Sequence, residues 1–443
     1  MTLLQAGWSK IAITPETGAT LTGFSAREGV STGVHDDLYV RSLAIESEGR
    51  AAALVSVEVL ALDGDFVGMV KHAIERRSGI PEANILIACT HTHAGPVTVK
   101  SFFNPDEKVD ETYMARLAAA IEQSVVEAWE RRAPASVGWG VARVAGVGVN
   151  RRDPEHGYVD QDAGILKVCD GEGAVRAVLI HYACHPTVLG PNNLLVTGDF
   201  PSAALAEVER ATGSFAMFFN GAQGDISMGH SSDLSAIGVI APGRTFEHAA
   251  ELGERLAGAV LAELPHIATS AVTLDSASVL AEMPLKNYPP SEELARESRI
   301  AEERLESLAG RSIEDPELRQ AKTEALYTSI NQYLAGFNSE YPAGFLPLEL
   351  RGLRIGETAL IGLPAEAFAE VGRNMKSACR SKILIVGLAN GYLGYIPCRQ
   401  AHFEGGYEIV SSRFAPEAED ALAAAAAKLA IEMSEERKPQ HGA

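Results

Sequence analysis

Apolar runs alternate with amphipathic segments along most of this chain. Short apolar runs bounded by Gly, Pro and Thr predict buried strands, and apolar positions three or four residues apart predict helices. The predicted strands cover residues 9–15, 39–47, 51–59, 85–89, 174–184, 215–219, 354–362 and 382–388, with further short strands over 137–169. The predicted helices cover residues 65–77, 111–132, 199–211, 245–264, 365–379 and 416–433. This order favours an α/β fold of mixed β-sheets layered with helices.

Residues 291–336 differ from the rest of the chain. They are rich in Glu, Arg, Ala and Leu, predict two helices and hold no candidate metal ligand. We expect a helical excursion or cap over the sheet. No Pro/Gly/Ser linker or charge block divides the chain, so we predict a single unit of residues 1–443, although that length would accommodate two or three domains.

Five of the apolar runs end in side chains that carry chemistry. The runs ILIACT, AVLIHYAC, ALIGLPA and KILIVGLANGYLG lead into imidazole, carboxylate or phenol, and FAMFF leads into the polar segment NGAQGDIS. The side chains at these ends are His91 and His93, His185, Glu366, Tyr395 and the segment 220–227. Buried strands that all finish in such groups predict one polar site at the C-terminal ends of the strands, and a metal-dependent enzyme is the leading hypothesis.

The histidines each have a structural alternative. Side chains alternate faces along a strand, so His91 and His93 are predicted to point the same way, as a metal ligand and a neighbour that moves a proton. His185 closes a strand where Pro186 stops the ladder, and it could simply cap that strand. His181 has the same strand parity, but its place inside the strand favours a structural role.

The remaining candidates are weaker when taken alone. Glu366 is expected in the first turn of a helix, where the helix dipole by itself would favour a carboxylate. Tyr395 lies between Gly and Pro, a common setting for a packing residue. The segment 220–227 lacks the Lys of a P-loop and does not match GxSxG. Ser227 therefore stays open as nucleophile, oxyanion donor or loop cap.

Composition and charge exclude several classes of function. The net charge of −20 and the absence of Lys/Arg clusters exclude a nucleic-acid partner and disfavour anionic membranes. The five scattered cysteines form no CxxC pair, which predicts buried reduced thiols. No signal peptide and no apolar stretch of transmembrane length is evident. We expect a cytoplasmic protein, with secretion of a processed chain as the alternative.

Together these groups predict a zinc centre. Two histidines and a carboxylate, completed by an oxygen ligand or water, suit catalytic zinc. The HExxH pattern of zincin proteases is absent. Water on such a metal has its pKa lowered to about 7 and attacks a carbonyl at neutral pH. His/carboxylate/phenol sites also accept other metals, including manganese and iron.

In these residues and their order, the chain resembles the neutral/alkaline ceramidase family, zinc amidases that cleave the N-acyl bond of ceramide. The matching segments are TGVHDDLYVRSLAI (32–45), ILIACTHTHAGP (85–96), VNRR (149–152), CHPTVLG (184–190), GDFP (198–201), NGAQGDIS (220–227), LPAE (363–366) and ANGYLGYIP (389–397). They span most of residues 6–415, and CTHTHAGP with NGAQGDIS is a specific combination.

The resemblance implies a role for each matching residue. It implies zinc ligation by His91, His185, Glu366 and Tyr395. It implies that His93 and Arg151 lie near the scissile carbonyl, that Ser227 is the family's active-site serine, and that Asp199 and Asp225 support ligands or loops.

The chain also departs from the family pattern. After His185 it has Pro-Thr where family members have Gly-Thr, and after GDIS it has Met228-Gly229 where they have Pro-Asn. The family's C-terminal β-sandwich domain is expected to be absent from a chain that stops at residue 443.

We therefore predict a zinc-dependent hydrolase of an amide (N-acyl) bond, with a changed small-molecule or lipid substrate. The alternatives are a zinc-dependent esterase, lactonase or amidase for small non-lipid substrates, and a non-catalytic zinc-binding protein. A phosphatase or sulfatase is weaker, because no Asp-rich two-metal set is evident.

Overall fold

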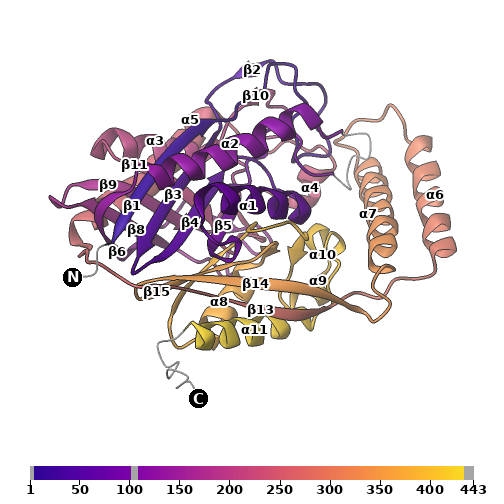
Figure 1. The fold of residues 1–443 in the computed structure, drawn as a ribbon. Helices are drawn as coiled ribbons and strands as arrows, with labels where there is room; N and C mark the ends of the chain where they lie inside the picture. The colour runs from indigo at the N-terminus through magenta and orange to yellow at the C-terminus, as the bar shows by residue number, and fades with distance from the viewer. Residues whose placement is uncertain (1–3, 101–107, 434–443) are drawn as a thin grey trace.

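The largest element of the fold is an eight-stranded sheet with the order β11-β9-β8-β6-β1-β3-β4-β5. The computed structural model describes residues 4–100 and 108–433 (Figure 1). The strands of this sheet are β1 (Gln5–Ala12), β3 (Tyr39–Ser47), β4 (Arg50–Val57), β5 (Ile85–Cys89), β6 (Ala133–Arg143), β8 (Asp162–Asp170), β9 (Val175–Tyr182) and β11 (Phe215–Asn220). The pairs β4–β5 and β9–β11 are parallel and the other pairs are antiparallel, so the sheet is mixed.

The two edges of this sheet approach each other. The Ser56 hydroxyl on β4 donates a hydrogen bond to the Phe218 carbonyl on β11 at 2.6 Å. The Asn220 amide at the end of β11 donates to the Thr90 carbonyl just beyond β5 at 3.2 Å. The carboxyl ends of β5, β9 and β11 therefore gather in one place, although β5 and β11 stand at opposite ends of the strand order.

A second, four-stranded sheet packs beside the first. It consists of β13 (Leu274–Pro284), β14 (Phe345–Ile355), β15 (Thr358–Gly362) and β17 (Lys382–Val386), and only β15 and β17 run parallel. The chain that leaves β17 joins the two sheets, because Gly387 N–H donates to the Asn220 carbonyl at 3.0 Å and the Leu388 carbonyl accepts from Cys89 N–H at 3.2 Å.

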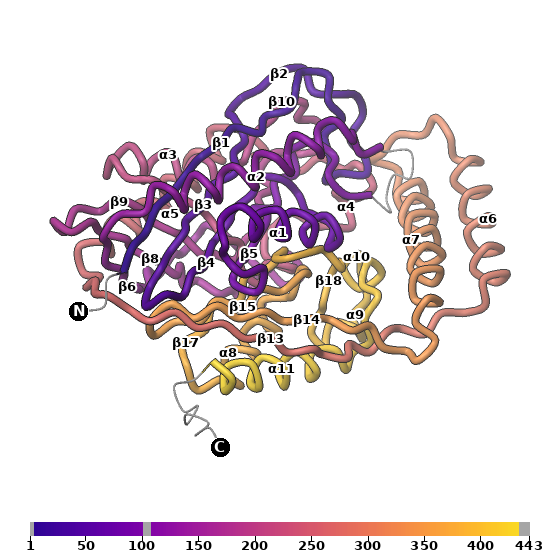
Figure 2. The backbone as a smooth tube through the Cα atoms, viewed as in Figure 1, coloured from indigo at the N-terminus to yellow at the C-terminus, as the bar shows by residue number. Residues whose placement is uncertain are grey.

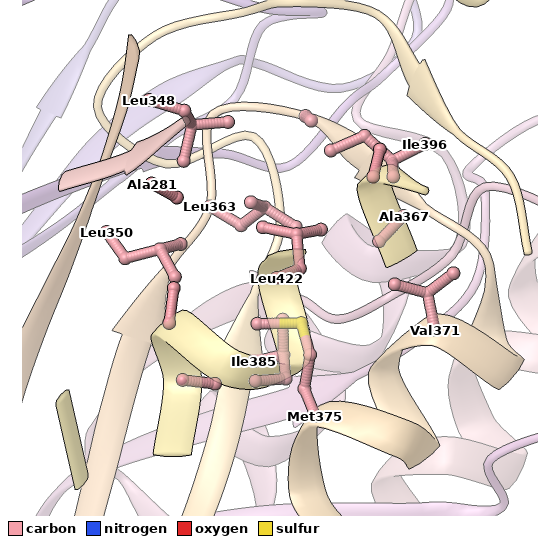
Figure 3. Close-up of a cluster of buried hydrophobic side chains, with 14 of the residues drawn as sticks. Ala281, Leu348, Leu350, Leu363, Ala367, Val371, Met375, Ile385, Ile396 and Leu422 are labelled. Atoms are coloured by element: carbon pink, nitrogen blue, oxygen red, sulfur yellow. The ribbon is translucent and has the colours of Figure 1, made fainter. Parts of the chain in front are cut away.

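Pairs of helices cover the outer faces of both sheets (Figure 1). Helices α1 (Gly64–Ser78) and α2 (Glu111–Glu130) pack on the β3–β5 side, and α3 (Asp199–Thr212) and α5 (Phe246–Glu263) pack on the β6–β11 side. Helices α8 (Ala369–Ala378) and α11 (Ala418–Glu432) cover the four-stranded sheet. Figure 3 shows this last core, where Leu350 of β14, Ile385 of β17, Met375 of α8 and Leu422 of α11 meet.

Local signals in the sequence set the helix ends. The Asp63 carboxylate accepts from Asp65 N–H at the start of α1, which ends at Gly79 with a left-handed φ of 75°. The Asp110 carboxylate caps α2 in the same way, and the Thr245 hydroxyl caps α5. These side chains satisfy backbone N–H groups that the first turn of a helix leaves without a partner.

The two helices expected within 291–336 are α6 (Ser291–Ser307) and α7 (Pro316–Asn338). They lie between β13 and β14, whose ends pair at Pro284 and Phe345, and they stand away from the sheets in Figure 2. Helix α7 packs against α6 and contacts α10 (Tyr407–Val410), and its Tyr327 hydroxyl donates to Asp233 on α4 (Ser232–Ala236). None of the described helices is long and apolar enough to cross a membrane.

The structure corrects four of the predicted elements. Residues 137–169 hold the long strands β6 and β8 rather than short ones, and the strand predicted over 354–362 is divided by a tight turn at residues 356–357 into the end of β14 and the whole of β15. Strand β13 was not predicted, and the helix expected from residue 365 begins at Ala369. The remaining short elements are β2 (Gly33–Val34), β7 (Val149–Asn150), β10 (Leu195–Val196), β12 (Ile226–Ser227), β16 (Glu366–Ala367), β18 (Tyr395–Ile396), α9 (Ala401–Glu404) and the 3₁₀ turns Glu82–Asn84 and Leu264–His266.

Candidate metal centre and active site

His91 lies two residues beyond the end of β5. Its φ of 75° is a left-handed conformation that costs a non-glycine residue about 1–3 kcal/mol and is typical of functional sites. Its backbone N–H donates to the Val59 carbonyl at 3.0 Å, and its Nδ1 lies 2.8 Å from the Leu60 carbonyl oxygen. His91 and His93 do lie together, but the predicted reason, side-chain alternation along a strand, is wrong because β5 ends at Cys89. The turn at His91 brings the two Nε2 atoms to 3.3 Å instead.

His185 follows β9 and is completely buried. Its Nδ1 lies 2.8 Å from the Gln223 carbonyl oxygen and 3.1 Å from that of Ile226. A carbonyl oxygen only accepts hydrogen bonds, so Nδ1 carries the proton and Nε2 presents a lone pair. Burial, together with the nearby Arg151 guanidinium, lowers the pKa of His185 to about 4, so the imidazole is neutral at neutral pH.

Glu366 joins the two imidazoles. Its Oε2 lies 2.9 Å from His185 Nε2 and 3.2 Å from His91 Nε2, and its Oε1 accepts from the Tyr392 hydroxyl at 2.7 Å. Burial alone would raise the pKa of this carboxyl, but the contacts with His91 and His185 hold it well below its usual range. Glu366 lies in strand β16, which pairs with Tyr395 in β18, and not in the first turn of a helix as predicted.

His93 forms one wall of the site. Its ring lies 5.0 Å from the Phe24 ring, between centroids, and a Cβ on Gly23 would come within 2.6 Å of it. Gly23 is therefore required for this close approach. Burial, followed by the neighbouring His91 and His185, lowers the pKa of His93 well below 6.5. Its Nδ1 has no hydrogen-bond partner among the described residues.

Arg151 and Tyr395 meet beside the centre, and of the two only Tyr395 lines the pocket described below. The Arg151 guanidinium donates to the Glu408 carboxylate at 2.7 Å, to the Gly224 carbonyl at 2.8 Å and to the Tyr395 hydroxyl at 3.3 Å. The Tyr395 ring stacks 6.4 Å from His185, between centroids. Burial, then the Glu366 carboxylate, raises the pKa of Tyr395 well above 10, so its hydroxyl stays protonated at neutral pH.

Three other predicted residues lie around this centre rather than in it. Asp199 accepts from the backbone N–H of Leu189 at 3.1 Å, in the loop after His185. Asp225 accepts from Ala369 N–H at 2.7 Å, at the start of α8. Ser227 is buried on β12, does not line the pocket described below, and its hydroxyl has no partner among the described residues. Its role stays a prediction.

His181 lies outside the centre. Its Nε2 lies 2.7 Å from the Ile385 carbonyl oxygen on β17, which fits the predicted structural role. Burial, followed by Lys376, lowers the pKa of His181 to about 4.

The sequence did not single out two residues that hold the centre in place. Asn220 is fully buried, donates to the carbonyls of Thr90 and Cys184 at 3.2 and 3.0 Å, and so joins the backbones beside His91 and His185. Tyr392 binds Glu366, as described above. It lies three residues before Tyr395 in the motif ANGYLGYIP. The motif therefore indicated a functional tyrosine, but it did not show that both tyrosines contribute to the site.

A small pocket of ≈ 50 Å³ opens onto the imidazoles and the carboxylate. Aromatic side chains form much of its wall, and none of its lining residues comes from α6 or α7. The lining residues are Thr22, Gly23, Phe24, Ser25, Leu60, His91, His93, Val99, Lys100, Glu366, Tyr392, Tyr395 and Tyr407.

The geometry offers two sets of metal ligands. The ligand atoms of His91, His93 and His185 all lie within 4.8 Å of one another. In the predicted set, Glu366 replaces His93. We favour Glu366, because its Oε2 touches both other imidazoles and because the Nδ1 atoms of His91 and His185 are fixed by carbonyls, as is usual for metal-binding histidines. His93 Nδ1 lacks such an anchor in the described part of the chain.

The fold and the site together define a class of protein. It is an α/β protein in which mixed sheets bring two histidine imidazoles and an ionised carboxylate together beside an aromatic pocket. The family model of neutral/alkaline non-lysosomal ceramidases, N-terminal part, matches residues 4–229. The chain belongs to this family, as its motifs predicted.

Individual relatives extend this finding. The neutral ceramidase of Pseudomonas aeruginosa is 22% identical over 478 residues, which cover 93% of this chain and 69% of that protein. Neutral ceramidase 1 of Arabidopsis thaliana is 26% identical over 215 residues, 43% of this chain. The chain spans only 27% of the length of that plant protein.

Solved structures show the same fold. The crystal structure of neutral ceramidase from Pseudomonas aeruginosa superposes with a TM-score of 0.75 at 19% identity, covering 97% of this chain and 74% of that one. A structure described as a ceramidase complexed with C2 gives a TM-score of 0.73 at 18% identity, with 97% and 75% coverage. The predicted fold class, α/β with mixed sheets and helices, is confirmed.

Proposed function

We propose that this protein is a zinc-dependent hydrolase that cleaves an N-acyl amide bond. One observation carries the proposal: the Nε2 atoms of His91 and His185 converge on Oε2 of Glu366 at 3.2 and 2.9 Å, and His91 and Glu366 line a pocket. Membership of the ceramidase family supports an amide as the scissile bond. We propose His91, His185 and Glu366 as ligands, with Tyr395 as the fourth. When bound, zinc polarises a carbonyl and lowers the pKa of water to about 7.

The remaining side chains have separable tasks in this proposal. The Tyr392 hydroxyl holds Oε1 of Glu366, so only Oε2 faces the imidazoles. Arg151 holds the Tyr395 hydroxyl in place, and both can donate hydrogen bonds to the oxyanion that develops as the carbonyl is attacked. We assign proton transfer to the leaving amine to His93, because both oxygens of Glu366 already have partners.

The residues beside the proposed site favour a second candidate beside ceramide. Pro186 follows His185, and Met228 and Gly229 follow Ser227, where the family pattern has other residues. We therefore keep an amide or ester with a short acyl chain as the second candidate for the same centre. Amides of increasing acyl length, assayed against the matching esters, separate these candidates.

Metal analysis combined with this panel tests the function. The wild type should carry about one zinc per chain and cleave amides, because three ligand types converge on one point. His91→Ala should lose the metal and slow cleavage by about a hundredfold or more, since the loss of one stabilising group already costs that much.

His72→Ala is the matched control, because His72 is exposed on α1 and touches only Glu82. It should keep both metal and activity. Full turnover by His91→Ala without bound metal would contradict the proposal, and a wild type that holds zinc but cleaves nothing would favour a non-catalytic zinc protein.

Tyr392→Phe should weaken zinc binding without removing it. The substitution deletes the 2.7 Å hydrogen bond to Glu366 Oε1 and leaves the ring in place. Loss of such an outer partner typically lowers metal affinity by about 10–100-fold. Competition with a zinc chelator measures the change, and an affinity equal to that of the wild type would show that Glu366 needs no anchor.

A further inference from the structure

Helix α7 reaches the pocket wall through one hydrogen-bonded carboxylate. The Tyr327 hydroxyl on α7 donates to Oδ1 of Asp233 on α4. The same Oδ1 accepts the backbone N–H of Tyr407, the first residue of α10, at 3.0 Å. Tyr407 lines the pocket, and its ring lies 6.1 Å from that of Tyr395, between centroids. A side chain of the helical excursion is therefore two hydrogen bonds away from the pocket wall.

Helix α4 connects α7 to other parts of the site as well. The Ser232 hydroxyl donates to Glu408 at 2.6 Å, and Glu408 in turn binds Arg151. On the side of the pocket mouth, the Ser25 hydroxyl donates to the Ala236 carbonyl at 2.6 Å. Lys322 of α7 donates to the carbonyl of Ile237 at 3.3 Å. Helix α4 thus lies between α7 and two walls of the pocket.

We propose that Tyr327 is a positioning residue for substrate binding: it fixes Asp233, which fixes the pocket wall at Tyr407. The inference rests on the proposed function, because it gives the α6–α7 excursion a role in selecting the substrate of that site. Tyr327 touches neither the pocket nor the metal centre, and it acts through α4 and α10.

The chemistry of the contact suits a fixed support. Burial, followed by the hydrogen bond to Asp233, raises the pKa of Tyr327 far above 10, so the phenol remains a donor throughout the neutral range. The root of the excursion is attached separately, where Lys286 Nζ donates to the Ser412 carbonyl at 2.7 Å and Asn338 donates to the carbonyl of Lys286 at 3.0 Å. Removing the Tyr327 hydroxyl therefore weakens the link between α7 and α4 without detaching the excursion.

The experiment compares four variants of the full chain. Tyr327→Phe removes only the hydroxyl, and Asp233→Ala removes the shared acceptor. Asp233→Asn keeps an oxygen that can accept both hydrogen bonds and serves as the conservative rescue. Tyr113→Phe is the control, because it deletes a tyrosine hydrogen bond that is more deeply buried than that of Tyr327, to the Ile13 carbonyl at 2.8 Å, on helix α2. The readouts are KM and kcat across the acyl-length panel, hydrogen exchange at the Tyr407 amide, and the melting temperature.

A positioning role predicts a specific pattern. Tyr327→Phe and Asp233→Ala should raise KM by about tenfold and leave kcat within about twofold, since small displacements of binding groups have large effects on substrate affinity. They should also speed exchange at the Tyr407 amide and alter the preferred acyl length. Asp233→Asn and Tyr113→Phe should match the wild type in KM, in exchange at the Tyr407 amide and in preferred acyl length.

Other patterns overturn the inference. If Tyr327→Phe lowers the melting temperature but leaves KM and Tyr407 exchange unchanged, as in Tyr113→Phe, the contact is only structural. If the wild type cleaves no member of the panel, the proposed function fails, and exchange at the Tyr407 amide alone decides the positioning role. Faster exchange in Tyr327→Phe then supports it, and unchanged exchange rejects it.

Discussion

Replacing Glu366 with Gln should remove bound metal and slow amide hydrolysis by about a thousandfold or more, the largest functional effect we expect from a single substitution. The glutamine keeps the volume of the side chain and can still accept from the Tyr392 hydroxyl. It removes the negative charge that lies 2.9 Å from His185 and 3.2 Å from His91. Two imidazoles without a carboxylate form a much poorer site for a divalent cation.

Metal content by mass spectrometry and kcat/KM on the preferred amide measure this result. Glu349→Gln, an identical change at an exposed position of β14, should alter neither quantity. A Glu366→Gln protein that retains one metal per chain would show that the three-histidine set His91, His93 and His185 is sufficient, and would shift the ligand assignment to His93.

Glu408→Ala should be the most destabilising of the charge deletions. Glu408 is fully buried and accepts from Arg151 at 2.7 Å and from Arg152 at 2.9 Å. Burial would raise the pKa of this carboxyl, but Arg151, Ser232 and Arg152 hold it below its usual value, so it is ionised at neutral pH. Deleting it leaves the buried Arg151 guanidinium without its carboxylate partner, which costs about 3–5 kcal/mol of unfolding free energy.

Glu404→Ala provides the matched comparison, because Glu404 binds the same Arg152 at 3.4 Å but is 51% exposed. An exposed pair contributes at most about 1 kcal/mol, so this variant should melt close to the wild type. Thermal unfolding of both variants measures the difference. Equal melting temperatures would mean that water reaches the Arg151–Glu408 pair and screens it.

Local patterns in the sequence predicted the elements that depend on local physics. Helix α1 has an aspartate at its start and a left-handed glycine at its end, and β5 is an uninterrupted apolar run. Strand β13 was missed because several of its side chains are partly exposed and its apolar positions are irregular. Glu366 was placed on a helix because the two-residue strand β16 forms only by pairing with Tyr395, which lies further along the chain.

The candidate site shows the same division. His91, His185 and Glu366 could be predicted because each follows an apolar run, and a polar residue after such a run can be recognised from the sequence alone. Asn220 appeared only as one polar residue in a loop, because three of its side-chain hydrogen bonds link segments far apart in the chain. No sequence motif marks Glu408. Its importance comes from its ion pair with Arg151, which lies far away in the chain.

The place where α6 and α7 leave the sheet has a consequence for how such proteins diversify. Pro284 and Phe345 are direct partners across β13 and β14, so the two ends of the excursion leave from neighbouring positions that the sheet already holds together. A loop whose ends are fixed in this way tolerates changes in length at small entropic cost, about 0.6 kcal/mol for each doubling. Insertions, deletions or exchange of the whole segment would leave the register of the sheet intact. The excursion is therefore an exchangeable module, and variation within it can proceed while the histidines and carboxylate remain constant.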